Sequence, residues 1–171
     1  MLELTEKVCY NSKKIWDENL NIGFRKERKR IPRLMTRISC AKNMEKQARQ
    51  IKIIAGKVKA TAELNDSAMA DAIWNALPLQ ARGSTWGDEI YFSIPVNRAQ
   101  GPVKEVVDLG ELGFWSPGKA FCIFYGQTPI SRAGEIRPAD PVVVFGKIIG
   151  DPKVFKPVTS GTSVIVERLE K

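Results

Sequence analysis

The chain has 171 residues, of which 43% are hydrophobic and 27% are charged, enough for one domain with a proper core plus an extension. It has no histidine and three widely spaced cysteines, which excludes Ser-His-Asp and Cys-His mechanisms and argues against a structural zinc site. The net charge of +8 is concentrated in residues 1–50, which carry 13 Lys and Arg against 6 Asp and Glu.

No apolar run reaches the roughly 20 residues that a membrane-spanning helix needs. The first residues include acids and lack the apolar core of a signal peptide. We therefore expect a cytoplasmic protein without a membrane partner. Neither a GxGxxG nor a Walker sequence is present, so no cofactor is predicted, and no metal site is predicted either.

Residues 1–49 are predicted to form a basic N-terminal extension, helical or disordered. The cluster Arg25–Arg30, followed by Arg33 and Arg37, is the kind of positive charge that attracts nucleic acid. One hypothesis is therefore that residues 25–37 bind nucleic acid or an acidic partner. Two alternatives remain: an arm without such a partner, and a native start at Met44, directly before the first predicted strand.

From residue 50 onward, short apolar runs bounded by glycine and proline indicate strands. Between them, Ala68–Leu77 is predicted to be a helix that begins at Asn65–Ser67, ends at Pro78 and closes one end of a barrel. Strands are predicted over residues 51–56, 57–64, 83–95, 106–110, 118–126, 142–150 and 162–168. This pattern predicts a mainly β fold, a closed barrel of about eight strands with one or two capping helices, over residues 50–171.

The run from Glu89 to Ile94 alternates polar and apolar residues, as a strand with one polar face does. Glu89 shares a face with Tyr91, and we select it as the polar anchor of a pocket. A carboxyl buried there would be paired or have a raised pKa. The alternative is that Glu89 points outward into solvent. Asp88 faces the opposite side of the strand, so the two carboxyls do not form an acid and base pair.

Residues 112–118 are predicted to be a loop that carries two adjacent aromatics, Phe114 and Trp115, near the surface as a binding lip. The remaining aromatics of the expected groove fit a place in the core better than a contact with a ligand. The predicted binding residues are Trp86, Glu89, Tyr91, Gln100, Phe114, Trp115, Phe121 and Tyr125.

Val143–Lys147 resembles the V-V-F-G-K run of cyclophilins, and Lys119–Phe124 resembles their S-Q-F-F-I-C strand. Trp86–Phe92 and Gly113–Gly118 resemble runs of a group of small prokaryotic cyclophilin-like proteins of uncharacterised function. The resemblance covers about residues 50–171 and implies an eight-stranded barrel with capping helices.

Cyclophilins isomerise X-Pro bonds with an arginine, a glutamine and an apolar pocket. Aligned on Pro95, the glutamine falls on Gln100, but the catalytic arginine falls on Phe92. The pocket phenylalanine falls on Cys122, and the histidine before V-V-F-G-K falls on Val142. The resemblance therefore implies the barrel without the usual isomerase site, and no catalytic residue is predicted.

We predict a binding domain that holds a small molecule or a peptide segment in a groove on the side of the barrel. The alternative is a peptidyl-prolyl isomerase with a rearranged site, to which Arg98 or Arg132 would contribute. The sequence does not name the ligand.

Overall fold

A computed structural model describes residues 49–97 and 101–169. The basic cluster at residues 25–37 lies outside the described residues, as do Arg98, Gln100 and all of the predicted extension except Arg49. The division at residue 49/50 therefore remains a prediction.

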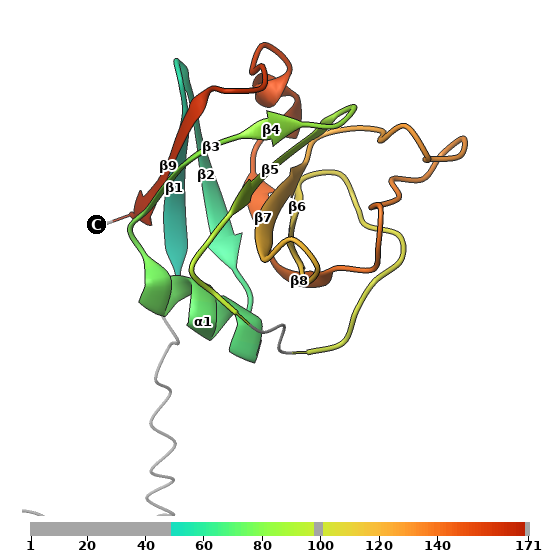
Figure 1. Ribbon diagram of the computed structural model, residues 1–171. Coiled ribbons are helices and arrows are strands. Elements are labelled where there is room, and N and C mark those ends of the chain that lie inside the picture. Colours follow the sequence, from blue (N-terminus) through green and yellow to red (C-terminus); the bar gives the residue numbers. More distant parts are fainter. Residues whose placement is uncertain (1–48, 98–100, 170–171) are drawn as a thin grey trace, which may run out of the picture. The chain divides into compact units, whose positions relative to one another are not determined.

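The described residues form nine strands, one α-helix and one 3-10 helix (Figure 1). In chain order these are β1 (Gln50–Ala55), β2 (Val58–Leu64), α1 (Ala68–Ala76), β3 (Leu79–Arg82), β4 (Ser84–Thr85), β5 (Glu89–Ser93), β6 (Glu111–Trp115), β7 (Ala120–Phe124), β8 (Val143–Ile149), η1 (Pro152–Phe155) and β9 (Ser163–Arg168).

All nine strands belong to one antiparallel sheet with the order β3-β9-β1-β2-β8-β6-β7-β5-β4. The two strands at the ends of this order, β3 and β4, are consecutive in the chain and separated only by Gly83. The sheet therefore curls into a nearly closed barrel, which confirms the predicted mainly β fold with one strand more than the expected eight.

The barrel core is built from alternating side chains. Ile90 and Phe92 of β5 are buried in the core, and Phe92 stacks on Phe121 of β7 with ring centroids 5.0 Å apart. Phe121 in turn meets Phe145 of β8 edge-on at 4.9 Å. Such aromatic contacts join strands that are far apart in the sequence.

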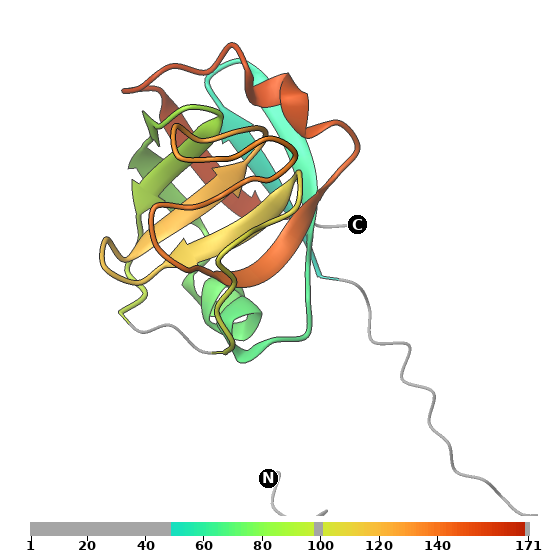
Figure 2. The same ribbon diagram turned by 90° about the vertical axis from the view of Figure 1, so that its right-hand side faces the viewer.

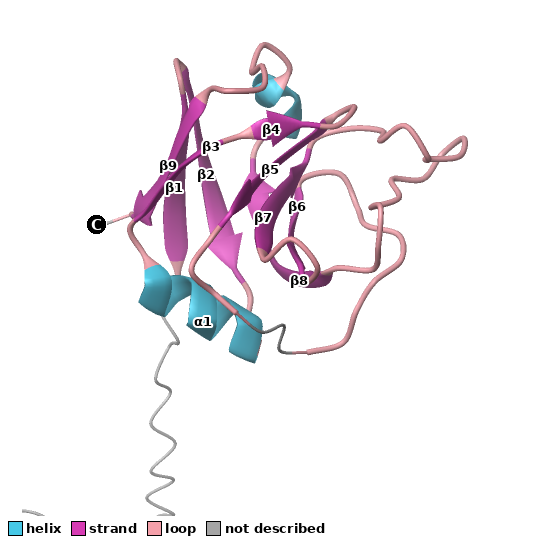
Figure 3. Ribbon diagram, viewed as in Figure 1, coloured by secondary structure: helices cyan, strands magenta, loops and turns pink. Residues whose placement is uncertain are grey.

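The two ends of the barrel are covered by α1 and η1 (Figure 3). The Ser67 hydroxyl accepts a hydrogen bond from the Ala70 amide at 3.1 Å and so caps α1, as predicted. Met69 and Ile73 of this helix are fully buried in the core. At the opposite end, η1 inserts Phe155, which is fully buried and lies 6.2 Å from the Tyr125 ring.

Two predictions about single elements were wrong. The predicted loop at residues 112–118 is wrong over its first part, because Glu111–Trp115 forms β6 between β7 and β8 and only the residues after Trp115 form a turn. The predicted strand at residues 106–110 holds one isolated bridge, between Val107 and Ile136. The strand β3 follows Pro78 directly and was not predicted.

Two long loops lie on the side of β6 and β7 that faces away from β1 and β9 (Figures 1 and 2). They are the β5–β6 loop, residues 94–110, and the β7–β8 loop, residues 125–142. The loops are joined to each other by the Val107–Ile136 bridge and by a second bridge between Lys104 and Val142. Because these loops cover it, β7 is buried on both faces.

Candidate functional site

A second apolar cluster lies outside the barrel, between β7 and the two long loops. Ala120, Cys122 and Phe124 point out of the barrel from β7, whereas Phe121 and Ile123 point into it. The outward residues pack against one buried side chain from each loop, Val107 and Ile136, and against Val142. This cluster attaches the loops to the barrel and forms the floor of the region described next.

Beside this cluster lies a cavity of about 190 Å³. One wall comes from the outer side of the barrel and the other from the β7–β8 loop. Its lining residues are Trp86, Glu89, Tyr91, Trp115, Pro138, Ala139 and Val142.

The alternation of β5 decides which side chains reach the cavity. Because successive strand residues point to opposite faces, burial of Ile90 and Phe92 in the barrel directs Glu89 and Tyr91 outward, into the cavity wall. Trp86 lies in the turn between β4 and β5, where its amide donates to the Glu89 carbonyl at 3.0 Å. The same strand therefore supplies both barrel residues and cavity residues.

Glu89 is a buried carboxyl in an apolar setting, with a side chain only 6% exposed. Burial raises its pKa from 4.5 to about 7, and a hydrogen bond from the Cys122 thiol opposes this rise. Burial also raises the pKa of Cys122 well above its usual value, and the nearby Glu89 charge adds to the effect. At neutral pH the thiol therefore stays protonated, while Glu89 is close to half ionised.

Trp115 is fixed by two contacts at the end of β6. Its indole Nε1–H donates to the Asp140 carboxylate at 2.8 Å, which ties the β7–β8 loop to the barrel. Its ring meets Tyr91 edge-on, with centroids 6.4 Å apart and planes at 82°. These contacts give the two rings defined orientations around the cavity.

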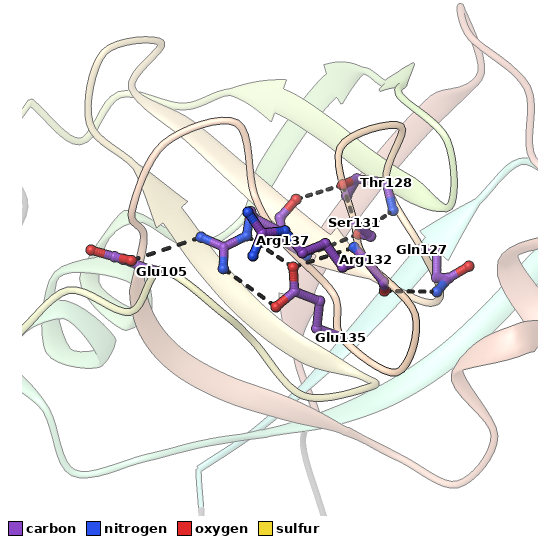
Figure 4. Close-up of polar contacts among 7 residues, drawn as sticks. All are labelled: Glu105, Gln127, Thr128, Ser131, Arg132, Glu135 and Arg137. Carbon is purple, nitrogen blue, oxygen red and sulfur yellow. Dashed lines mark hydrogen bonds and ion pairs between the residues drawn. The ribbon is translucent and has the colours of Figure 1, made fainter.

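A hydrogen-bond network shapes the β7–β8 loop before it reaches the cavity (Figure 4). The buried Thr128 hydroxyl donates to the Arg137 carbonyl, so its 2.9 Å contact with Ser131 makes the Ser131 hydroxyl the donor there. The Ser131 oxygen also accepts from the Thr128 and Arg137 amides, each at 3.0 Å. The network ends at Arg137, directly before the cavity residues Pro138 and Ala139.

Ion pairs on the outer side of the same loop hold the Arg137 side chain away from the cavity. Its Nε donates to Glu135 at 3.0 Å, and its Nη1 lies 3.7 Å from a carboxylate oxygen of Glu105 in the β5–β6 loop (Figure 4). These side chains all remain in contact with solvent, Glu105 most of all, so the ion pairs orient the loop more than they stabilise the fold.

The structure brings four of the eight predicted binding residues together: Trp86, Glu89, Tyr91 and Trp115 all line the cavity. The other three described residues, Phe114, Phe121 and Tyr125, belong to the barrel core, with exposures of 3% or less. Phe114 is therefore not part of an exposed lip, which corrects that expectation. Gln100 lies outside the described residues.

Sequence reasoning missed the opposite wall, Pro138 and Ala139, which stand in the long connection rich in Pro and charge. Their only sequence signal is the length of that connection, because long ordered loops are often functional. Phe92, the position aligned with the cyclophilin arginine, lies in the barrel core, and among the described residues none that lines the cavity is basic.

No group of three or more potential metal ligands occurs within residues 49–97 and 101–169. Over the same residues, no helix is long and apolar enough to cross a membrane.

A nearly closed antiparallel barrel with helices at its ends and a cavity on its side defines a cyclophilin-like protein. The family model described as Cyclophilin-like matches residues 49–167, and the chain belongs to this family. A search of curated proteins finds no match.

Two solved structures are similar to this chain. The first is the solution structure of a hypothetical protein from Archaeoglobus fulgidus, with 39% sequence identity and a TM-score of 0.62, covering 71% of this chain and 95% of that one. The second is McbB in complex with tryptophan, with 15% identity and a TM-score of 0.56, covering 71% of this chain and 45% of McbB. At that identity the likeness to McbB shows the fold alone.

Proposed function

We propose that this protein binds a small molecule, or a single side chain of a peptide, in the cavity beside β5 and β6. The observation that carries the proposal is a buried carboxyl, Glu89, set among aromatic rings in a cavity that opens under an ordered loop. Ligand sites typically combine apolar walls with a few well-placed polar groups of this kind.

The size of the cavity favours a compact ligand. Its volume of about 190 Å³ is below the roughly 300–1,000 Å³ of sites for drug-sized molecules. A single ring with a short polar substituent matches this volume better than an extended peptide. McbB was solved with tryptophan, which makes tryptophan and indole reasonable first probes here alongside neutral and charged benzyl compounds.

A cavity-filling variant tests the proposal without removing any polar group. Ala139 is exposed and lines the cavity, so Ala139→Trp should fill it while the core stays intact. Ala133 is exposed on the same loop and does not line the cavity, so Ala133→Trp is the matched control.

We expect at least one probe to shift indole N–H signals of the wild type and of Ala133→Trp in NMR titrations. Ala139→Trp should weaken that binding by at least about tenfold. Equal affinity in both variants would place the ligand elsewhere, and no response to any probe would contradict the proposed function.

A further inference from the structure

The cavity has an unbalanced charge. Among the described residues that line it, Glu89 is the only carboxyl, and no lysine or arginine lines the cavity. Asp140 adds a second negative charge close by, held at the indole nitrogen of Trp115. Since an ionised carboxylate buried without a positive partner is costly, a cation entering the cavity would stabilise it.

The groups that face Glu89 supply no internal cation. On β7 its partner is the neutral thiol of Cys122, and on its own strand the neighbour on the same face is Tyr91. Near it, Tyr125 has a raised pKa, through burial first and then through the charges of Asp88 and Glu89. All of these groups are neutral or acidic.

Two basic side chains of the covering loops already have carboxylate partners, and a third, Arg132, is exposed and does not line the cavity. Lys104 donates to Glu111 at 2.8 Å, and the Arg137 guanidinium faces Glu135 and Glu105. Neither residue lines the cavity. No described residue that lines the cavity therefore supplies the positive charge that would complement Glu89.

The rest of the lining also suits a cation. Trp86, Tyr91 and Trp115 present three aromatic rings, and the faces of such rings attract ammonium groups, most strongly for tryptophan. Because the Tyr91 and Trp115 planes stand at 82°, they form a corner instead of a single flat wall. A corner of aromatic rings beside a carboxylate is a common arrangement for holding an alkylated ammonium.

We propose, building on the function proposed above, that the ligand is an organic cation: a primary or methylated amine on a compact apolar or aromatic body. The ammonium would lie between Glu89 and the rings, with its body against the apolar part of the lining. An anionic ligand of the same shape would be repelled by Glu89, and a neutral one would leave the carboxylate without a positively charged partner.

Three probes of one shape test the charge preference: benzylamine, benzyl alcohol and benzoate. Each is titrated by NMR into the full chain at about pH 8.5, where Glu89 is ionised and an alkylamine is still protonated. We expect benzylamine to bind at least about tenfold more tightly than benzyl alcohol, and benzoate to bind least.

Two variants assign the preference to Glu89. Glu89→Gln should bring benzylamine to within about threefold of benzyl alcohol, because the carboxylate is replaced by an amide of similar shape. Benzyl alcohol binding itself should persist in that variant, which also shows that the cavity is still formed. Glu63→Gln removes an exposed carboxyl on β2, away from the cavity, and should keep the full preference.

The dependence on pH gives a second readout. Lowering the pH to about 5.5 protonates Glu89 but not the probe amine, so the preference of the wild type should shrink towards that of Glu89→Gln. A preference that stays constant over this range would assign it to the rings alone and would overturn the role given to Glu89.

The two proposals fail in different ways. If benzyl alcohol or benzoate binds as tightly as benzylamine, the cation inference is wrong while the cavity remains a binding site. If none of the three probes, indole or tryptophan binds, the proposed function is wrong and the inference with it.

Discussion

Two opposing effects set the pKa of Glu89: burial in the apolar cavity wall raises it, and the hydrogen bond from the Cys122 thiol lowers it. A carboxyl only 6% exposed, with a pKa of about 7, must lose its proton inside the folded protein at a pH where an unfolded chain has already lost it. The folded protein therefore tolerates the charge at a cost. That cost is typical of residues kept for binding or chemistry instead of stability.

This cost predicts how stability depends on pH. The pKa of Glu89 rises from 4.5 in the unfolded chain to about 7 in the folded protein. The stability that protonated Glu89 contributes to the folded protein is therefore fully present below pH 4.5. It is lost as the pH rises through 7, because the buried carboxyl must then ionise. The rise corresponds to about 3 kcal/mol in the free energy of unfolding.

Glu89→Gln should remove that dependence. We expect denaturant unfolding to give a variant more stable than the wild type by up to about 3 kcal/mol above pH 8, and close to it near pH 4. The other titrating groups are common to both proteins, so the difference reports Glu89. A difference that does not change over this range would contradict the raised pKa.

Residue periodicity predicted part of this site but not all of it. Alternation along β5 was sufficient to place Glu89 and Tyr91 on one face, because the apolar residues between and beside them in the same strand must enter the barrel. Phe114 and Trp115 are adjacent, and their pattern did not reveal that one faces the core and the other the cavity. That distinction depends on the pairing of β6 with both β7 and β8, which a local pattern does not contain.

At the scale of elements, the β7–β8 loop is as important to the site as the strands. It forms one wall of the cavity, and its shape depends on the buried residue Thr128. The Thr128 hydroxyl accepts a hydrogen bond from Ser131 and donates one to the Arg137 carbonyl. The outer ion pairs of Arg137 lie in contact with solvent. The two kinds of contact should therefore differ in how much they contribute.

Thr128→Val keeps the shape of the side chain but leaves the Arg137 carbonyl without its donor. We expect a loss of about 1–3 kcal/mol in the free energy of unfolding, because a buried acceptor becomes unsatisfied. The affinity for the cavity probe should also fall, since Pro138 and Ala139 follow Arg137 directly.

Glu135→Gln is the matched control, because it removes the charge of a solvent-contacting ion pair on the same loop. It should leave both stability and probe affinity close to those of the wild type. Calorimetry and NMR titration of the two variants measure both quantities. Equal effects of the two substitutions would show that the buried network does not shape the wall.

The whole barrel was easier to predict than the loops that complete it. Glycine-bounded apolar runs such as residues 118–126 and 142–150 indicate buried strands, and several of them indicate a closed sheet. The β3 strand was missed because it follows Pro78 with only four residues, and it forms by pairing with β9 at the far end of the chain. Long-range pairing of this kind leaves little local signal.

The distribution of charge over the whole chain predicts where any affinity for nucleic acid would reside. Residues 51–171 carry 14 Lys and Arg against 13 Asp and Glu, so their net charge is only +1, whereas residues 1–50 carry +7. If residues 25–37 bind nucleic acid, as the sequence suggests, that binding should be electrostatic and should weaken steeply with salt.

The test uses the full chain with Arg25, Lys26, Arg28, Lys29 and Arg30 changed to Gln. We expect the wild type to bind duplex DNA at low salt, and the variant to reduce the slope of log affinity against log salt by about 4, in proportion to the charges removed. Probe binding in the cavity should be unchanged, because the described residues that line it all lie between residues 86 and 142. Equal retention of both proteins on DNA would show that these five residues do not carry the affinity, and no retention of either would exclude the basic cluster as a nucleic-acid site.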